Sequence, residues 1–131
     1  MTRKAATKII PREDDEQRAV VDWLNTYRIA FTAVPNGGKR SRIEAAIMVG
    51  LGVQRGFPDL IVVERPPAHP DALCAAIELK RREGGVVSPE QEAWLARLQS
   101  LGWVVAVCEG ADEAIAQLET WGYGRRRREV P

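Results

Sequence analysis

Histidine is almost absent from this chain of 131 residues: His69, in a proline-rich stretch, is the only one. Cysteine is nearly as rare, with Cys74 and Cys108 alone. These three side chains cannot build a structural zinc site, and no histidine triad, paired-histidine centre or cysteine–histidine dyad is encoded. If the protein is a hydrolase, its chemistry must come from carboxylates, lysine and a metal ion, without an organic cofactor.

A large net charge and long apolar runs are also lacking. The formal net charge is +1, so any affinity for nucleic acid must come from a local basic patch. No apolar run is long enough to span a membrane, and the basic N-terminus lacks the apolar segment of a secretory signal. We therefore expect a cytoplasmic protein without a membrane partner, in which both cysteines are buried free thiols.

Charged residues stand at the ends of two short apolar runs, residues 60–63 and 74–77. Asp59 precedes the first run, and Glu78 and Lys80 follow the second. Both runs are typical of buried strands, and the stretch between them is typical of a loop, which predicts an antiparallel pair. Asp59 and Glu78 would then meet at one sheet edge. Lys80 would share a strand face with Glu78, because side chains two apart point the same way.

Two carboxylates and an ammonium at one edge suit a hard divalent cation. Magnesium binds through one or two carboxylates and completes its shell with water and substrate phosphate. Lys80 could position an attacking water or neutralise charge developing on the phosphate. The alternative is a Glu78–Lys80 ion pair at a strand end, with Asp59 as a turn residue. The ordered combination of Pro58 and Asp59, strand, loop, strand and Glu78 to Lys80 favours the metal site.

The remaining elements predict an α/β fold in which helices flank a mixed sheet. Residues 74–108 read as strand, helix and strand, which predicts a right-handed crossover between parallel strands. We expect a disordered basic arm over residues 1–12, one domain over 13–122 and a basic tail over 123–131. The first predicted helix is 14–29, with Asp14 or Asp15 as its cap, and the second is 42–49, with Ser41 as its cap. A third helix starts at Ser88, and a fourth spans 111–121. Two further strands are predicted at 30–34 and 103–108.

A turn followed by a helix start, residues 36–42, could cradle phosphate through its backbone and cations. Its candidate nucleic-acid-binding residues are Asn36, Lys39, Arg40 and Arg42, and Arg81 could extend the patch. The segment is not a Walker A motif, because Ala33 stands where the leading glycine is required. The alternative is an ordinary surface turn.

Four segments in order, residues 35–40, 56–60, 78–80 and 88–91, resemble the virus-type replication-repair nuclease (VRR-NUC) domain. This family belongs to the PD-(D/E)XK nuclease superfamily, and the resemblance covers residues 13–118. It implies a restriction-endonuclease-like fold and a Mg²⁺- or Mn²⁺-dependent endonuclease. Stand-alone members resemble Holliday junction resolvases and are small, often phage-encoded homodimers. The expected location is therefore the cytoplasm of a bacterium or a phage-infected cell.

The same resemblance assigns roles to individual residues. Asp59 and Glu78 would ligate the metal with help from the Leu79 backbone carbonyl, and Lys80 would assist the nucleophile. Glu16 would complete the metal site, although an acid in a first helical turn is also explained by the helix dipole. Gln91 would lean toward the site, although it also stands where a capping box needs it.

We therefore predict a metal-dependent DNA endonuclease that acts as a homodimer and selects branched or four-way junction DNA. Cutting two strands symmetrically needs two sites related by a two-fold axis. One alternative is a non-catalytic nucleic-acid-binding module of the same fold. Another is a nucleotide-binding or phosphotransferase domain that uses the segment 36–41.

Overall fold

The computed structural model describes residues 12–35 and 41–124. The expected arm up to residue 11 and the arginine-rich end of the expected tail lie outside the described residues. The same holds for three candidate phosphate-binding residues, Asn36, Lys39 and Arg40.

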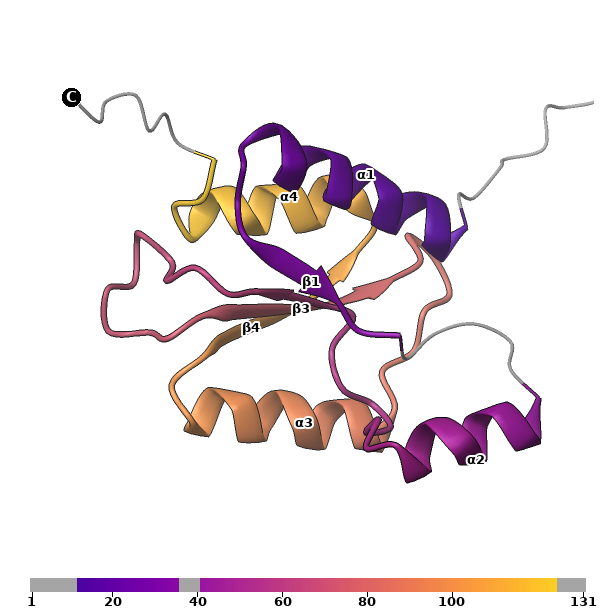
Figure 1. Ribbon diagram of the computed structural model, residues 1–131. Helices are drawn as coiled ribbons and strands as arrows, with labels where there is room; N and C mark the ends of the chain where they lie inside the picture. Colours follow the sequence, from indigo (N-terminus) through magenta and orange to yellow (C-terminus); the bar gives the residue numbers. More distant parts are fainter. Residues whose placement is uncertain (1–11, 36–40, 125–131) are drawn as a thin grey trace, which may run out of the picture.

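The centre of the protein is a mixed four-stranded sheet, which confirms the predicted α/β class (Figure 1). Its strands lie in the order of the chain: β1 (Phe31–Ala33), β2 (Leu60–Val62), β3 (Ala75–Lys80) and β4 (Val104–Glu109). β2 is antiparallel to both β1 and β3, as the loop between the two apolar runs predicts. β3 and β4 are parallel and joined by a helix, as expected for the crossover.

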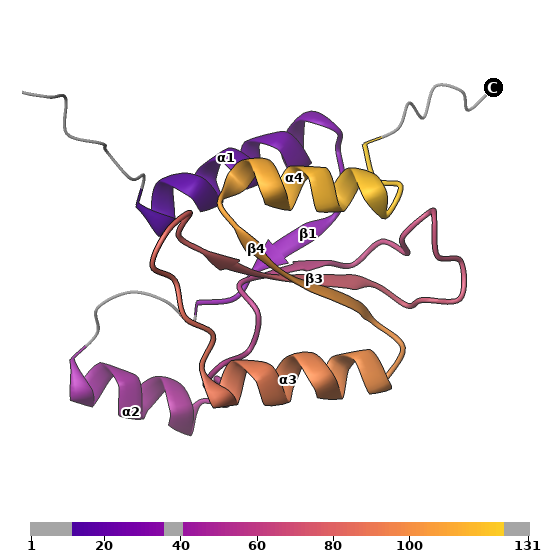
Figure 2. The same cartoon turned by 180° about the vertical axis from the view of Figure 1, so that it is seen from behind.

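Helices cover both faces of this sheet. α1 (Glu13–Thr26) and α4 (Ala111–Thr120) lie side by side on one face, and α3 (Pro89–Ser100) lies on the other, as Figures 1 and 2 show. The core lies between the sheet and the α1–α4 layer, and it contains Ile77 and Leu79 of β3. Because alternate residues face opposite sides, Glu78 and Lys80 point to the α3 side.

α2 (Arg42–Gly50) lies apart from these layers, beyond the end of α3 (Figure 1). The Ser41 hydroxyl accepts a hydrogen bond from the backbone N–H of Glu44, so the predicted cap is confirmed. None of the helix residues is buried, although most are apolar. An isolated helix of this length is unstable in water without packing against an apolar surface.

Several predicted element boundaries differ from those of the structure by a few residues. α1 begins at Glu13 with Arg12 as its N-cap residue, so Asp14 and Asp15 lie in the first turn instead of capping it. There their charges complement the positive end of the helix dipole. α1 ends at Thr26. Arg28 has a positive φ of 54°, which is incompatible with a right-handed α-helix. β3 extends beyond the apolar run to Lys80, so Glu78 and Lys80 lie in one strand.

Tyr123, assigned from the sequence to the tail, is 3% exposed and belongs to the core, where its hydroxyl donates a hydrogen bond to the Glu64 carbonyl at 2.6 Å. Both cysteines are free thiols, as expected. Cys108 is buried in β4, whereas Cys74 is only half-buried and lies directly before β3. Within residues 12–35 and 41–124, no helix is long and apolar enough to cross a membrane.

Candidate active site

The structure brings Asp59 and Glu78 together at the ends of the two central strands. Leu60 pairs with Ile77, so Asp59, directly before β2, lies opposite Glu78, the next residue of β3. The Leu79 backbone N–H donates a hydrogen bond of 2.7 Å to Asp59 Oδ2, which fixes this carboxylate. Asp59 and Glu78 are only 8% and 2% exposed. The site lies at the end of the middle strands, not at an outer edge strand.

Burial changes the protonation of both carboxyl groups. It raises the pKa of Asp59. Burial, together with the nearby negative charge of Asp59, raises the pKa of Glu78 to about 9. Two buried carboxylates repel each other and lack contact with water, and both effects disfavour ionisation of the pair. Glu78 Oε2 is buried and has no hydrogen-bond partner among the described residues. A cation between these groups would satisfy this oxygen and reverse both effects.

Gln91 makes both of the contacts that the sequence left as alternatives, one in the cap of α3 and one with Glu78. Its backbone N–H donates to the Ser88 hydroxyl, and its Oε1 accepts from the Ser88 backbone N–H, which completes a capping box. The remaining Nε2 donates to Glu78 Oε1 at 3.0 Å. The start of α3 therefore orients Glu78 and leaves its second oxygen available.

Gly56 explains how the segment before Asp59 meets α3. Its φ is +82°, and a Cβ built there would lie 2.7 Å from the Glu90 carbonyl carbon and 2.8 Å from the Gln91 nitrogen. Both atoms belong to the backbone of the first turn of α3, which cannot give way like a flexible side chain. Glycine at position 56 therefore allows the close approach that places Asp59, Glu78 and Gln91 together.

We expect Gly56→Ala to destabilise the fold by more than about 1 kcal/mol, because alanine is strained at this positive φ and also meets the α3 backbone. Thermal or urea unfolding of the purified variant measures the loss. Gly52→Ala is the matched control, since Gly52 has φ +101° but a Cβ built there would meet no atom of the described residues within 4 Å. Equal losses in the two variants would show that the contact with α3 contributes nothing.

Lys80, the last residue of β3, acts electrostatically on this pair. Its positive charge lowers the pKa of Asp59 and of Glu78, against the larger effect of burial. Glu13, in the first turn of α1, belongs to the same group. Desolvation and then the charge of Asp59 raise the pKa of Glu13, Lys80 lowers it, and Glu13 in turn raises the pKa of Glu78. Sequence reasoning missed Glu13.

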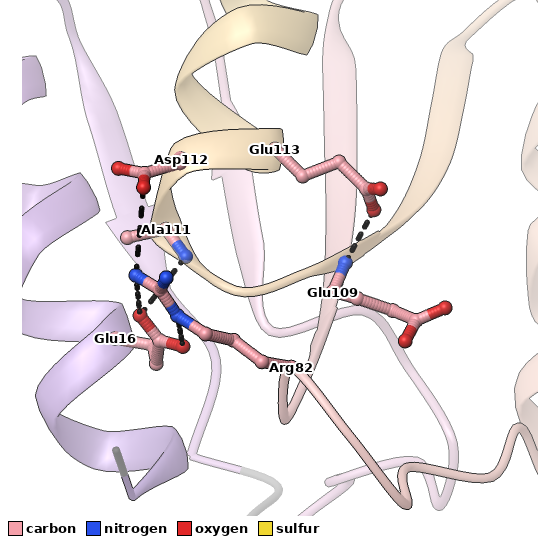
Figure 3. Close-up of polar contacts among 6 residues, drawn as sticks. All are labelled: Glu16, Arg82, Glu109, Ala111, Asp112 and Glu113. Carbon is pink, nitrogen blue, oxygen red and sulfur yellow. Dashed lines mark hydrogen bonds and ion pairs between the residues drawn. The ribbon is translucent and has the colours of Figure 1, made fainter. Parts of the chain in front are cut away.

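Glu16, which the sequence places in the metal site, makes its hydrogen bonds with groups other than the carboxylate pair. Its Oε2 accepts a hydrogen bond of 2.7 Å from Arg82 Nε. Its Oε1 accepts two hydrogen bonds of 3.2 Å, one from Arg82 Nη2 and one from the Ala111 backbone N–H (Figure 3). The bond with Arg82 holds the pKa of Glu16 below its usual value. Glu16 therefore links α1 to the end of β3 and the start of α4.

The described candidates for nucleic-acid binding lie on the surface. Arg42 is exposed at the start of α2, and Arg81 is exposed directly after β3. Arg81 lowers the pKa of Glu13, which places it near the acidic group. Both positions leave the guanidinium groups available to phosphate.

The residues present suit a divalent cation that keeps part of its water shell. Among the described residues, no group of three or more histidine, cysteine, aspartate or glutamate side chains could hold a metal. Magnesium does not require such a cage, since one or two carboxylates with waters and phosphate suffice. The unpartnered Glu78 Oε2 and the raised pKa of Glu78 are the features that a cation would resolve.

A mixed sheet with flanking helices and a buried carboxylate pair beside a lysine defines the class of α/β nuclease domains. The VRR-NUC domain family model matches residues 11–112, and the chain belongs to this family of nuclease domains. One solved structure, a VRR_NUC domain protein, is similar in fold, with a TM-score of 0.68 and 24% identity over 88% of this chain and 90% of that chain. No curated protein sequence matches the chain.

Proposed function

We propose that the protein is a Mg²⁺- or Mn²⁺-dependent endodeoxyribonuclease that hydrolyses phosphodiester bonds at the Asp59–Glu78 pair. The observation that carries this proposal is the buried Glu78 Oε2, unpartnered among the described residues and beside a second carboxylate in a nuclease-family domain. Asp59, Glu78 and the Leu79 carbonyl would hold the metal. We do not assign Glu16 to it, because Arg82 and Ala111 use its oxygens.

Each residue then has a defined task. When bound, the metal lowers the pKa of its water and stabilises negative charge on the phosphate. Asp59 is fixed by the Leu79 N–H, and Gln91 fixes one oxygen of Glu78, so both carboxylates are oriented before substrate arrives. Lys80 supplies the positive charge that offsets charge developing on the phosphate. Exposed Arg42 and Arg81 would contact the DNA backbone, together with Asn36, Lys39 and Arg40.

We further propose that DNA shape, rather than sequence, selects the substrate in the cytoplasm of a bacterium or phage-infected cell. Phosphate contacts position a nucleic acid but do not specify its sequence. The test compares a four-way junction with a linear duplex of the same sequence, each with Mg²⁺, Mn²⁺ or EDTA. We expect metal-dependent paired nicks near the branch. Binding without cleavage in every metal would instead support a non-catalytic nucleic-acid-binding module.

The partner that would cover α2 is a second copy of the chain. Ile43, Ile47 and Leu51 recur every four residues along α2 and its end, and they are 75%, 56% and 78% exposed. Such spacing puts them on one helix face. Two copies related by a two-fold axis bury identical surfaces against each other, and they also provide the two sites that symmetric cutting needs.

We expect Ile47→Glu to convert the dimer into monomers, because it places charges against each other in the apolar contact. Sedimentation or light scattering measures the molar mass. Leu73→Glu is the matched control, since Leu73 is 55% exposed in the β2–β3 connection, against 56% for Ile47. A monomeric wild-type protein, or an Ile47→Glu variant as dimeric as the control, would contradict this interface.

The metal-free protein is expected to lose stability as the pH rises. The Glu78 carboxyl ionises near 4.5 when unfolded and at about 9 when folded. Between these values the folded state binds more protons, so the free energy of unfolding falls by up to about 1.4 kcal/mol per pH unit. Mg²⁺ or Mn²⁺ should reverse the loss by binding the ionised pair. Urea unfolding from pH 5 to 9, with and without metal, measures both trends, and a flat metal-free profile would contradict them.

A further inference from the structure

The Lys80 side chain is in contact with the backbone of the connection that follows it. A Cβ built on Gly85 would lie 2.8 Å from Lys80 Cβ and 3.4 Å from Lys80 Cδ. Residues 81–88, which join β3 to α3, therefore turn back against the aliphatic stem of the lysine. Gly85 therefore lies beside the first and third carbons of the flexible four-carbon stem that carries the Lys80 ammonium.

The two ends of this connection are fixed. At its start, Arg82 makes a two-bond ion pair with Glu16, which is only 3% exposed. Figure 3 shows this carboxylate between Arg82 and the first N–H of α4. At its end, the Ser88–Gln91 capping box fixes the start of α3. Gly110 keeps the first anchor open, because a Cβ there would lie 2.7 Å from Arg82 Cγ and 2.9 Å from Glu16 Oε2.

We propose that residues 81–88 form a positioning clamp for Lys80, anchored by the Glu16–Arg82 ion pair and contacting the lysine stem through Gly85. The inference rests on the proposed nuclease function for its catalytic consequence, but the restriction of Lys80 is a property of the fold. Glu16 thus supports the chemistry through Lys80, without touching metal or substrate. A Cβ at position 85 would meet Lys80 Cβ and Cδ and the Arg81 nitrogen, so the connection and the lysine stem would both have to shift.

The first experiment is kinetic. Gly85→Ala should lower kcat on junction DNA by about 10- to 100-fold at saturating metal, the effect of a small displacement of a reacting group. KM for DNA should stay within about twofold, because no phosphate contact is lost. Gly84→Asn is the control, since a Cβ at Gly84 meets no described atom within 4 Å and asparagine tolerates its φ of +81°.

The second experiment does not depend on activity. The chain has four lysines, Lys4, Lys8, Lys39 and Lys80, so NMR spectra of ¹³C-lysine-labelled protein are simple, and Lys80→Ala assigns the signal. A restricted stem gives separate resonances for the two Hε protons of Lys80 in the wild type and in Gly84→Asn. These two resonances should merge or shift in Gly85→Ala, in Glu16→Gln and in Arg82→Lys. Of these variants, Arg82→Lys keeps the charge and disturbs the fold least.

The outcomes separate the two proposals. An unchanged Lys80 signal in folded Gly85→Ala and Arg82→Lys, or a kcat of Gly85→Ala equal to that of Gly84→Asn, overturns the clamp. If the wild type cleaves no DNA with either metal, the proposed function fails, and the NMR comparison still decides whether Lys80 is held.

Discussion

Glu78→Gln is expected to reduce metal-dependent DNA cleavage by at least about a thousandfold, because it removes the charge that holds the metal at the reacting phosphate. The fold should survive, since glutamine has the shape of the protonated carboxyl that burial favours at this position. In the absence of metal at pH 8, the variant should even be more stable, by about 1–3 kcal/mol, the cost of a poorly satisfied buried group. Cleavage assays and urea unfolding measure the two effects.

The metal response provides the control for this variant. Mg²⁺ or Mn²⁺ should stabilise the wild type against unfolding, by mass action on the folded state, and should leave Glu78→Gln nearly unaffected. Glu109→Gln is a suitable comparison, because Glu109 is an exposed acid on the neighbouring strand, paired with Lys80 in the sheet register. Near wild-type cleavage by Glu78→Gln, or loss of the metal response in Glu109→Gln alone, would move the site away from Glu78.

Lys80→Ala should slow cleavage by about a hundredfold or more, the effect of losing one group that stabilises charge in the transition state. Metal affinity should change much less than the rate, because lysine is not a ligand. Binding of DNA should also be nearly preserved, since Arg42 and Arg81 remain on the surface. Single-turnover cleavage at increasing metal concentration separates rate from affinity.

Lys80→Arg sharpens this comparison, since it keeps the positive charge but changes its shape and reach. It should recover only a small part of the rate if the position of the ammonium matters. A normal rate at saturating metal in Lys80→Ala, with weaker metal binding, would make Lys80 a structural residue instead.

The strand pair at the centre of the site was predictable because it depends on local pattern. Two short apolar runs joined by a proline-rich loop specify an antiparallel pair, and the alternation of side chains then fixes the faces of Glu78 and Lys80. The capping box at Ser88 was equally visible, because its residues are close together in the sequence. The contact of Gln91 with Glu78 depends on how α3 docks, so geometry alone could show that both roles coexist.

The surroundings of the acids of α1 could not be predicted from the sequence. Glu13, Asp14, Asp15 and Glu16 all suit a first helical turn, so composition cannot rank them. The family resemblance selected Glu16, because it matches the acidic position on the first helix. The bond between Glu16 and Arg82, 66 residues away in the chain, depends on tertiary packing, and no local signal reports it.

The bond from the Ala111 N–H to Glu16 joins residues 95 positions apart. Closing so long a loop is entropically costly, so contacts of this kind form late in folding. The first turn of α4 has no side-chain cap of its own and uses a carboxylate from the first helix instead. A chain truncated before α4 would lack the Ala111 N–H, so the buried Glu16 carboxylate would lose one hydrogen-bond donor. During synthesis, the N-terminal helix must therefore wait for almost the whole domain to emerge before its environment is complete.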